Sequence, residues 1–279
     1  MVQTARKVQT LMTLLLAHTD SYLREFDGVV TRVDKKACAL ILDRTAFYAG
    51  GGGQPCDVGT IHWMDGNTRH EVEIIKAKKG GADVSHYLVP TQTGSDDTIS
   101  SGIRDSGAVR SPRLIALPAV GTTITGVINW ARRYQLMRTH TAMHILCGVV
   151  WRDYGAQVTG GNMAPLNGRM DFEFENLKRE LVDEIEEKIN TEVLAAREVH
   201  VAILPRTDAE QIPGLIRTKI NLVPSSITEI RTVEIVGLDL QADGGTHVAN
   251  TREVGRLRVI DYKSKGRINK RIRIALEDS

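Results

Sequence analysis

The sequence predicts an α+β protein, with a small β-barrel-like N-terminal domain at residues 1–128 and an α+β domain with an antiparallel sheet at residues 129–279. Three observations support this fold class. Strand-like apolar patterns fill residues 22–75. Two long helical patterns follow, at residues 130–154 and 178–197. Short strand patterns lie between and after these helices, and that mixture is typical of α+β architecture.

The expected strands of the first domain are short and separated by turns. Closely spaced valines precede a charged turn, and an apolar run of strand length follows at residues 37–42. Glycines at residues 50–53 then interrupt regular structure. Residues 91–112 are rich in Ser, Gly, Asp and Arg with almost no large apolar side chain, so we expect a flexible insertion there. A strand pattern resumes at residues 121–128, which places the insertion within the first domain.

The predicted helices of the second domain have recognisable ends and faces. Asn129 is a suitable N-cap for the first helix, and Gly155 is a suitable stop. The second helix has one apolar face, formed by Leu181, Ile185, Ile189 and Val193. Strand patterns occupy residues 169–175, 198–204, 230–237, 256–262 and 270–276.

Composition excludes several classes of protein. Hydrophobic residues make up 42% of the chain and charged residues 25%, which is typical of a globular protein. No apolar stretch approaches the roughly 20 residues that cross a bilayer. Three cysteines cannot form a disulfide framework, so we expect a reducing compartment, the cytoplasm. The basic start of the chain, with Arg6 and Lys7, leaves a mitochondrial presequence as the alternative.

Two pairs of residues have the spacing of metal ligands. His140 and His144 lie four apart in the first predicted helix, hence on one face, although such a pair alone is more often a surface pair than a metal site. Asp243 and His247 are also four apart, but the two glycines between them indicate a tight loop. If the pairs meet, they form a four-ligand site whose nitrogen and oxygen atoms suit zinc.

The C-terminal segment is strongly basic within a chain whose formal net charge is only +2. Residues 252–273 contain nine Lys or Arg against two acids. Such a stripe is either a phosphate-contacting face or a solvated sheet edge, and charge alone does not separate the two.

Four motifs in the same order resemble those of the alanyl-tRNA synthetase editing domains and of their freestanding relatives, the AlaX proteins. Residues 138–146, RTHTAMHIL, are similar to the H-T-A-x-H-L signature, and residues 243–248, DGGTHV, to C-G-G-T-H-V. Residues 43–55 resemble the glycine-rich motif of the medium-length AlaX class. Residues 266–271, GRINKR, are similar to the basic K-G-x-x-N-x-R ending. The similarity covers residues 20–276 apart from the insertion.

This resemblance implies a zinc-dependent hydrolase that deacylates mischarged tRNA(Ala), with serine as the first candidate amino acid and glycine as the second. It implies that Thr45 offers a hydroxyl to the serine side chain, while Gln54 lies close to the scissile ester. The zinc ion would activate a water or anchor the substrate. No membrane and no obligate protein partner is expected. The residues expected to contact tRNA are Arg132, Arg133, Arg256, Lys265, Arg267, Lys270 and Arg271.

The chain departs from the family pattern at Asp243, where cysteine is usual. Aspartate is a harder zinc ligand than a thiolate, so metal affinity and identity are the properties this exchange affects. Two other functions stay open at this point. The chain is alternatively a non-catalytic tRNA-binding module that retains the fold, or a zinc hydrolase of small esters.

Overall fold

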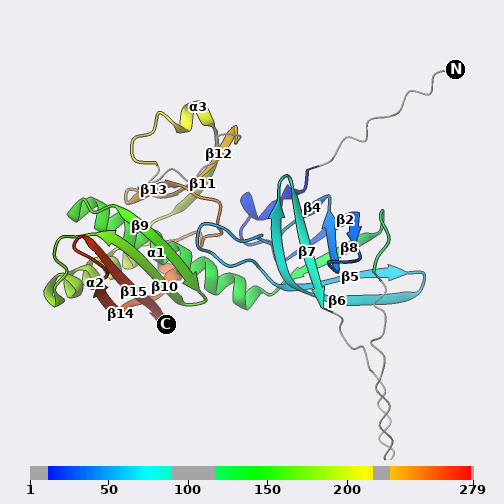
Figure 1. Cartoon of the computed structure of the whole chain (residues 1–279), viewed down its shortest axis with the longest axis horizontal. Helices are drawn as coiled ribbons and strands as arrows, with labels where there is room; N and C mark the ends of the chain where they lie inside the picture. The colour runs from blue at the N-terminus through cyan, green and yellow to red at the C-terminus, as the bar shows by residue number, and fades with distance from the viewer. Residues whose placement is uncertain (1–11, 90–116, 216–226, 278–279) are drawn as a thin grey trace, which may run out of the picture.

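The computed structural model describes residues 12–89, 117–215 and 227–277. The insertion predicted at residues 91–112 lies outside these described residues. The described strands form a closed six-stranded barrel, a four-stranded sheet, a three-stranded sheet and one short parallel pair. Figure 1 shows the barrel at one end of the molecule and the four-stranded sheet with its helices at the other. This architecture confirms the predicted α+β class with a barrel in the N-terminal part.

The barrel is built from strands that all precede residue 129. They pair antiparallel in the order β2-β3-β7-β6-β5-β8, and β8 closes the barrel against β2. The strands are β2 (Glu25–Asp34), β3 (Ala39–Leu42), β5 (Gly59–Asp65), β6 (Thr68–Gly80), β7 (Asp83–Val89) and β8 (Thr123–Ile128). Alternate side chains point inward, and Leu40, Ile61, Ile74 and Ile124 fill the interior with no exposed surface. The domain boundary at residue 128 stays a prediction.

Helix α1 (Trp130–Tyr154) has the predicted bounds. Its N-cap is Asn129, whose side-chain oxygen accepts the N–H of Arg132 at 3.1 Å. Gly155 ends the helix with a left-handed φ of 63°, which glycine adopts without strain. Most of the helix is buried, because it packs against α2, strands β9 and β10, and strand β13. The two candidate ligands of α1, His140 and His144, are therefore held in a rigid element.

The four-stranded antiparallel sheet has the order β14-β15-β10-β9, and α1 and α2 pack against it. Its strands are β9 (Val158–Ala164), β10 (Asn167–Glu173), β14 (Arg256–Ser264) and β15 (Asn269–Glu277). The three-stranded sheet is formed by β11 (Val199–Pro205), β12 (Glu229–Ile235) and β13 (Asp239–Ala242). Between these elements lie the short helix α3 (Arg206–Ala209) and the 3-10 turn η2 (Thr251–Val254); another, η1 (Leu16–His18), precedes the barrel.

The observed elements differ from the sequence prediction in several respects, and strands β7, β9 and β13 lie where no strand was predicted. Helix α2 (Arg179–Leu194) stops before the predicted end at residue 197, because Ala196 adopts a left-handed φ of 51° and turns the chain. Strand β6 was not predicted as a single element. It buries only Val72, Ile74 and Ala77 among thirteen residues, so its apolar periodicity is weak. No helix in the described parts of the chain is long and apolar enough to span a membrane.

Candidate metal centre

Four side chains meet between helix α1 and the loop that follows strand β13. His140 and His144 lie one turn apart in α1, while Asp243 and His247 belong to the loop. One potential ligand atom from each residue lies within 4.8 Å of the others. The ring centroids of His140 and His247 are 4.2 Å apart. The two i, i+4 pairs identified in the sequence therefore converge on one point.

Gly245 allows the loop to approach α1 this closely. A Cβ atom at this position would lie 2.2 Å from Cε1 of His140 and 2.7 Å from Oε1 of Gln54, so a side chain would push the loop away. The N–H of Gly245 also donates to Oδ2 of Asp243 at 2.7 Å and orients the carboxylate. Gly244 has open space beside its Cα. Of the two glycines, it is therefore Gly245 that must lack a side chain for the loop to approach α1.

Each histidine has a hydrogen-bond partner at Nδ1. Nδ1 of His140 lies 3.0 Å from Oε1 of Gln54, Nδ1 of His144 lies 3.0 Å from Oδ2 of Asp239, and Nδ1 of His247 lies 3.1 Å from Oγ1 of Thr141. A proton on each Nδ1 satisfies these acceptors and leaves Nε2 as the ligand atom. Such partners orient metal-binding histidines and are part of the site.

Sequence reasoning missed two of these partners. Thr141 lies between the two helical histidines, so its place in the motif is the signal that could have identified it. Asp239 lies in β13, and its approach to His144 depends on how this strand packs on α1. Nothing in the local sequence indicates that approach.

Gln54 connects the glycine-rich loop of residues 50–53, which it follows, to the loop of residues 243–247. Its Oε1 accepts the N–H of Thr246 at 3.0 Å besides facing His140, and its Nε2 donates to Oγ1 of Thr246 at 2.8 Å. The side chain is 3% exposed. Its amide orientation is therefore determined by three contacts, and it lies directly beside one potential metal ligand.

The glycine-rich loop passes over the same site. Gly50, Gly51, Gly52 and Gly53 all have positive φ, a conformation that other residues adopt only with strain. A Cβ on Gly52 would lie 3.6 Å from Oδ1 of Asp243. The carbonyl oxygen of Gly53 accepts the N–H of Met163 in β9 at 3.2 Å. The loop therefore bridges the barrel and the second sheet at the metal centre.

Burial determines the charge of the histidines facing Asp243. It lowers the pKa of His140 well below its ordinary value and that of His247 to about 4, although the carboxylate of Asp243 opposes both shifts. Burial disfavours the charged form of Asp243, but the neighbouring imidazoles, His140 first and then His247, outweigh it and hold its pKa well below the usual range. Burial also opposes protonation of His144, yet Asp239 outweighs it and raises its pKa.

The donor set fits a divalent cation. Three imidazoles and one carboxylate are ligands that zinc accepts in tetrahedral sites. Asp243 lies 3.6 Å from Nε2 of His140 and 3.0 Å from Nε2 of His247, so a carboxylate oxygen and two imidazole nitrogens face one another directly. Arg231 holds the loop in place by donating from Nη1 to the backbone oxygen of Asp243 at 2.9 Å. Its role was not predicted from the sequence.

Thr45 lies in the short strand β4 (Arg44–Thr45), which pairs in parallel with β1 (Leu14–Leu15). It is 1% exposed, and its Oγ1 lies 2.8 Å from Nε2 of His86. The same oxygen accepts the N–H of Phe47 at 3.1 Å. Thr45 is thus held against barrel strand β7, and the chain continues from it to the glycine-rich loop of residues 50–53.

Arg133 has no surface with which to contact tRNA, contrary to expectation. It is 0% exposed and pairs with the equally buried carboxylate of Asp57. It also donates to the backbone oxygens of Ser21 and Ala46. All of these partners precede α1 in the chain, so Arg133 links the helix to the N-terminal part of the protein. Its charge is evident from the sequence, whereas its burial depends on the fold.

The other predicted tRNA contacts divide by exposure. Arg256, Lys265 and Arg267 are exposed, and Arg132 is partly so. Lys270 is buried and donates to the backbone oxygens of Gly266 and Arg267, which stabilises the turn between β14 and β15. Arg271 makes a two-point ion pair with Asp171 of β10 at 2.6 and 2.7 Å. These last two cations are engaged within the sheet.

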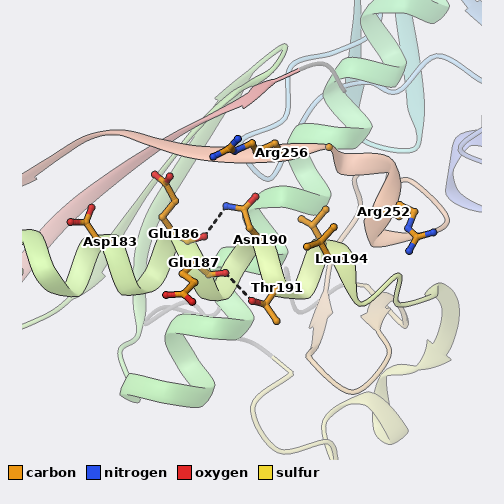
Figure 2. Close-up of a pocket in the computed structure, with 10 residues that line it drawn as sticks. Asp183, Glu186, Glu187, Asn190, Thr191, Leu194, Arg252 and Arg256 are labelled. Carbon is orange, nitrogen blue, oxygen red and sulfur yellow. Dashed lines mark hydrogen bonds between the residues drawn. The ribbon is translucent and has the colours of Figure 1, made fainter.

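A separate cavity of about 760 Å³ lies between α2 and residues 252–256, and none of His140, His144, Asp243 and His247 lines it. Figure 2 shows Asp183, Glu186 and Glu187 along its α2 wall, with Arg252 and Arg256 across from the helix. The acidic wall is unsuited to a phosphate backbone. This cavity is distinct from the metal centre.

Comparison with known proteins places these residues in a family. The profile described as "Threonyl and Alanyl tRNA synthetase second additional domain" matches residues 230–273, which include Asp243 and His247. The chain is 33% identical over 268 residues to the alanyl-tRNA editing protein AlaX-M of Methanosarcina acetivorans, covering 96% of this chain and 100% of that protein. Its identity to AlaX-M of Saccharolobus solfataricus is 35% over 263 residues, covering 94% and 98%.

The chain belongs to the AlaX-M family. It is also 34% identical over 257 residues to an alanine–tRNA ligase of Ignicoccus hospitalis, covering 90% of this chain but 24% of the ligase. The likeness to AlaX-M proteins thus extends over both chains, whereas the ligase contains the shared region as one part. The resemblance that the four motifs indicated is confirmed.

Proposed function

We propose that this AlaX-M protein is a trans-editing deacylase that hydrolyses the ester of mischarged tRNA(Ala), with serine as the primary amino acid and glycine as the second. Its near full-length similarity to proteins named alanyl-tRNA editing proteins supports the editing role. The observation that carries the hydrolytic part is the arrangement of three histidines with Nδ1 engaged and Nε2 available around Asp243.

The metal held by these residues is proposed to be zinc, with His140, His144, Asp243 and His247 as ligands. A zinc ion held there supplies a Lewis acid for the ester carbonyl or the attacking water. Gln54 keeps His140 in the required tautomer and lies where the loop of residues 50–53 approaches Asp243. An aminoacyl ester bound between that loop and α1 would be held against Gln54 and shielded from bulk water.

Selectivity for serine is proposed to come from Thr45, whose hydroxyl meets the hydroxyl of the substrate. A site that pairs with a substrate hydroxyl disfavours the analogue lacking it, because its own polar group then stays unpaired. Alanine is thereby spared. Glycine has no hydroxyl either, so its release must depend on size rather than on Thr45.

The RNA is proposed to be held by Arg132, Arg256, Lys265 and Arg267, which are at least partly exposed and suited to phosphate contacts. This basic surface favours an RNA substrate over a free small ester. The complete donor set of the metal centre favours an enzyme over a non-catalytic tRNA-binding module.

A deacylation assay tests this function directly. Release of amino acid from Ser-, Gly- and Ala-tRNA(Ala) is measured before chelation, after chelation and after zinc is restored. Chelation should abolish serine release and zinc should restore it, while alanine stays attached throughout. His144→Ala should be inactive yet bind tRNA, whereas His200→Ala, at an exposed histidine of β11, is the matched control. Full activity after chelation would refute the metal-dependent mechanism, and no release from any substrate would favour the non-catalytic module.

A further inference from the structure

His86 is a buried polar side chain that is not one of the four candidate metal ligands. It lies in barrel strand β7 and is 0% exposed. Its ring contacts Phe47 edge-on at 5.7 Å between centroids. Nδ1 lies 3.2 Å from the backbone oxygen of Leu40, and Nε2 lies 2.8 Å from Oγ1 of Thr45. Both ring nitrogens are therefore engaged, each with a different kind of partner.

The partner at Nδ1 fixes the tautomer. A carbonyl oxygen accepts hydrogen bonds and cannot donate one, so Nδ1 must carry a proton to bond to Leu40. Burial lowers the pKa of His86 to about 4, so the ring is neutral at physiological pH and Nε2 carries no proton. Nε2 then accepts, and the hydroxyl of Thr45 must donate to it.

This arrangement leaves the hydroxyl group of Thr45 able to form one further hydrogen bond. A threonine hydroxyl offers one proton and two lone pairs. The proton is directed to His86, and the N–H of Phe47 occupies one lone pair. A single lone pair remains, so Thr45 can offer a further partner an acceptor and not a donor.

We propose that His86 is a specificity-determining positioning residue, which fixes the hydroxyl of Thr45 as an acceptor for a donor group on the substrate. The inference rests on the proposed function, in which Thr45 meets the substrate side chain. The serine hydroxyl donates to Thr45, whereas the side chains of alanine and glycine have no donor. A freely rotating threonine would accept or donate, and would discriminate less between polar groups.

Two amide substitutions separate the contacts of His86. His86→Gln places an oxygen near the position of Nε2, so it can still accept from Thr45. His86→Asn reaches the position of Nδ1, so it can keep the bond to Leu40 but leaves Thr45 without its acceptor. Both variants are polar and of graded size. Serine and glycine release by each zinc-loaded variant are measured on tRNA(Ala), together with Thr45→Val and the Thr45→Val/His86→Asn double variant.

We expect His86→Asn to reduce serine release about tenfold relative to glycine release, which corresponds to one unmet hydrogen bond. His86→Gln should retain most of the serine preference. The double variant should discriminate no less than Thr45→Val alone, because His86 acts through Thr45. Glycine release reports on folding and on the metal centre in every variant.

The outcomes distinguish the inference from the function on which it rests. If Thr45→Val slows serine and glycine release equally, the proposed reading of serine by Thr45 fails. If Thr45→Val is selective but both His86 variants keep the wild-type ratio, only the role of His86 fails. Equal slowing of both substrates by His86→Asn would make His86 a structural residue and would also overturn the inference.

A substrate analogue tests the requirement for a donor without any substitution in the protein. 3-Fluoroalanine resembles serine in size but has fluorine in place of the hydroxyl. Chemically charged 3-fluoroalanyl-tRNA(Ala) should be spared as alanine is. Release at the rate of serine would show that the pocket does not require a donor and would contradict the assignment of His86.

Discussion

The Oε1 atom of Gln54 lies 3.0 Å from Nδ1 of His140, although the residues are 86 positions apart. Gln54 follows the glycine-rich loop, and His140 lies in α1. This hydrogen bond makes the loop a part of the metal centre, because it determines which nitrogen of His140 faces Asp243. The position of the loop and the orientation of one ligand are thereby coupled.

Replacing Gln54 by alanine should weaken metal binding as well as hydrolysis. His140 and Thr246 would lose their buried partner, and removal of such a partner typically costs about 10–100-fold in metal affinity or activity. Zinc affinity is measured by competition with a chromophoric chelator. Gln157→Ala is the matched control, because Gln157 is exposed. Wild-type zinc affinity in Gln54→Ala would show that His140 does not depend on this contact.

Replacing Asp243 by cysteine, the residue usual in the family, should tighten zinc binding. A thiolate is softer than a carboxylate and suits zinc better, so we expect a gain of about tenfold, or about 1.4 kcal/mol. The gain is partly offset, because sulfur accepts the N–H of Gly245 less well than Oδ2 does. The same chelator competition measures it.

Asp243→Asn is the control for this exchange, since it keeps the shape and removes the negative charge. It should bind zinc more weakly than the wild type. If cysteine and asparagine both weaken binding, the loop has adapted to a carboxylate, and the hydrogen bonds around Asp243 matter more than ligand softness.

The sequence predicted the four potential ligands because their spacing is local. His140 and His144 share a helix face, and the bounds of that helix follow from Asn129 and Gly155. The partners of these ligands could not be predicted in the same way. Asp239 reaches His144 only because β13 packs on α1, and that packing is a property of the assembled fold.

Burial was the other property that the sequence did not supply. The positive charge of Arg133 led us to predict an RNA contact, but a charge in the sequence does not show whether the side chain is exposed. Its pairing with buried Asp57 becomes evident only from the folded structure. His86 shows no motif at all. Its importance appears only when the barrel brings β7 beside Thr45.

Arg133 and Arg256 should have opposite effects when replaced. Arg133→Met leaves Asp57 buried and unpaired, which should lower the free energy of unfolding by about 3–5 kcal/mol. Arg256→Ala removes a side chain that is 63% exposed, so stability should change by less than about 0.5 kcal/mol. Instead it should weaken tRNA binding and reduce the salt dependence by about one phosphate contact. Urea unfolding and salt-dependent tRNA binding measure the two effects.

An equal loss of stability in both variants would contradict this division. So would tRNA binding that is weaker in a folded Arg133→Met protein than in Arg256→Ala. Either result would return Arg133 to the group of RNA contacts.

His86 should make the stability of the protein depend on pH in the acid range. Burial lowers its pKa from 6.5 to about 4. Between these values the unfolded chain binds a proton that the folded protein excludes, so the free energy of unfolding falls as the pH decreases through this window. Above pH 6.5 His86 is neutral in both states and does not lower the free energy of unfolding. At pH 5 His86 alone should have lowered it by about 2 kcal/mol. His18, whose pKa burial also lowers to about 4, acts in the same direction. Urea unfolding of wild type and His86→Gln at pH 7.5 and 5.0 isolates the share of His86. Between pH 7.5 and 5.0 the His86→Gln variant should lose less stability than the wild type. An identical loss would mean that the folded protein accommodates the charged ring.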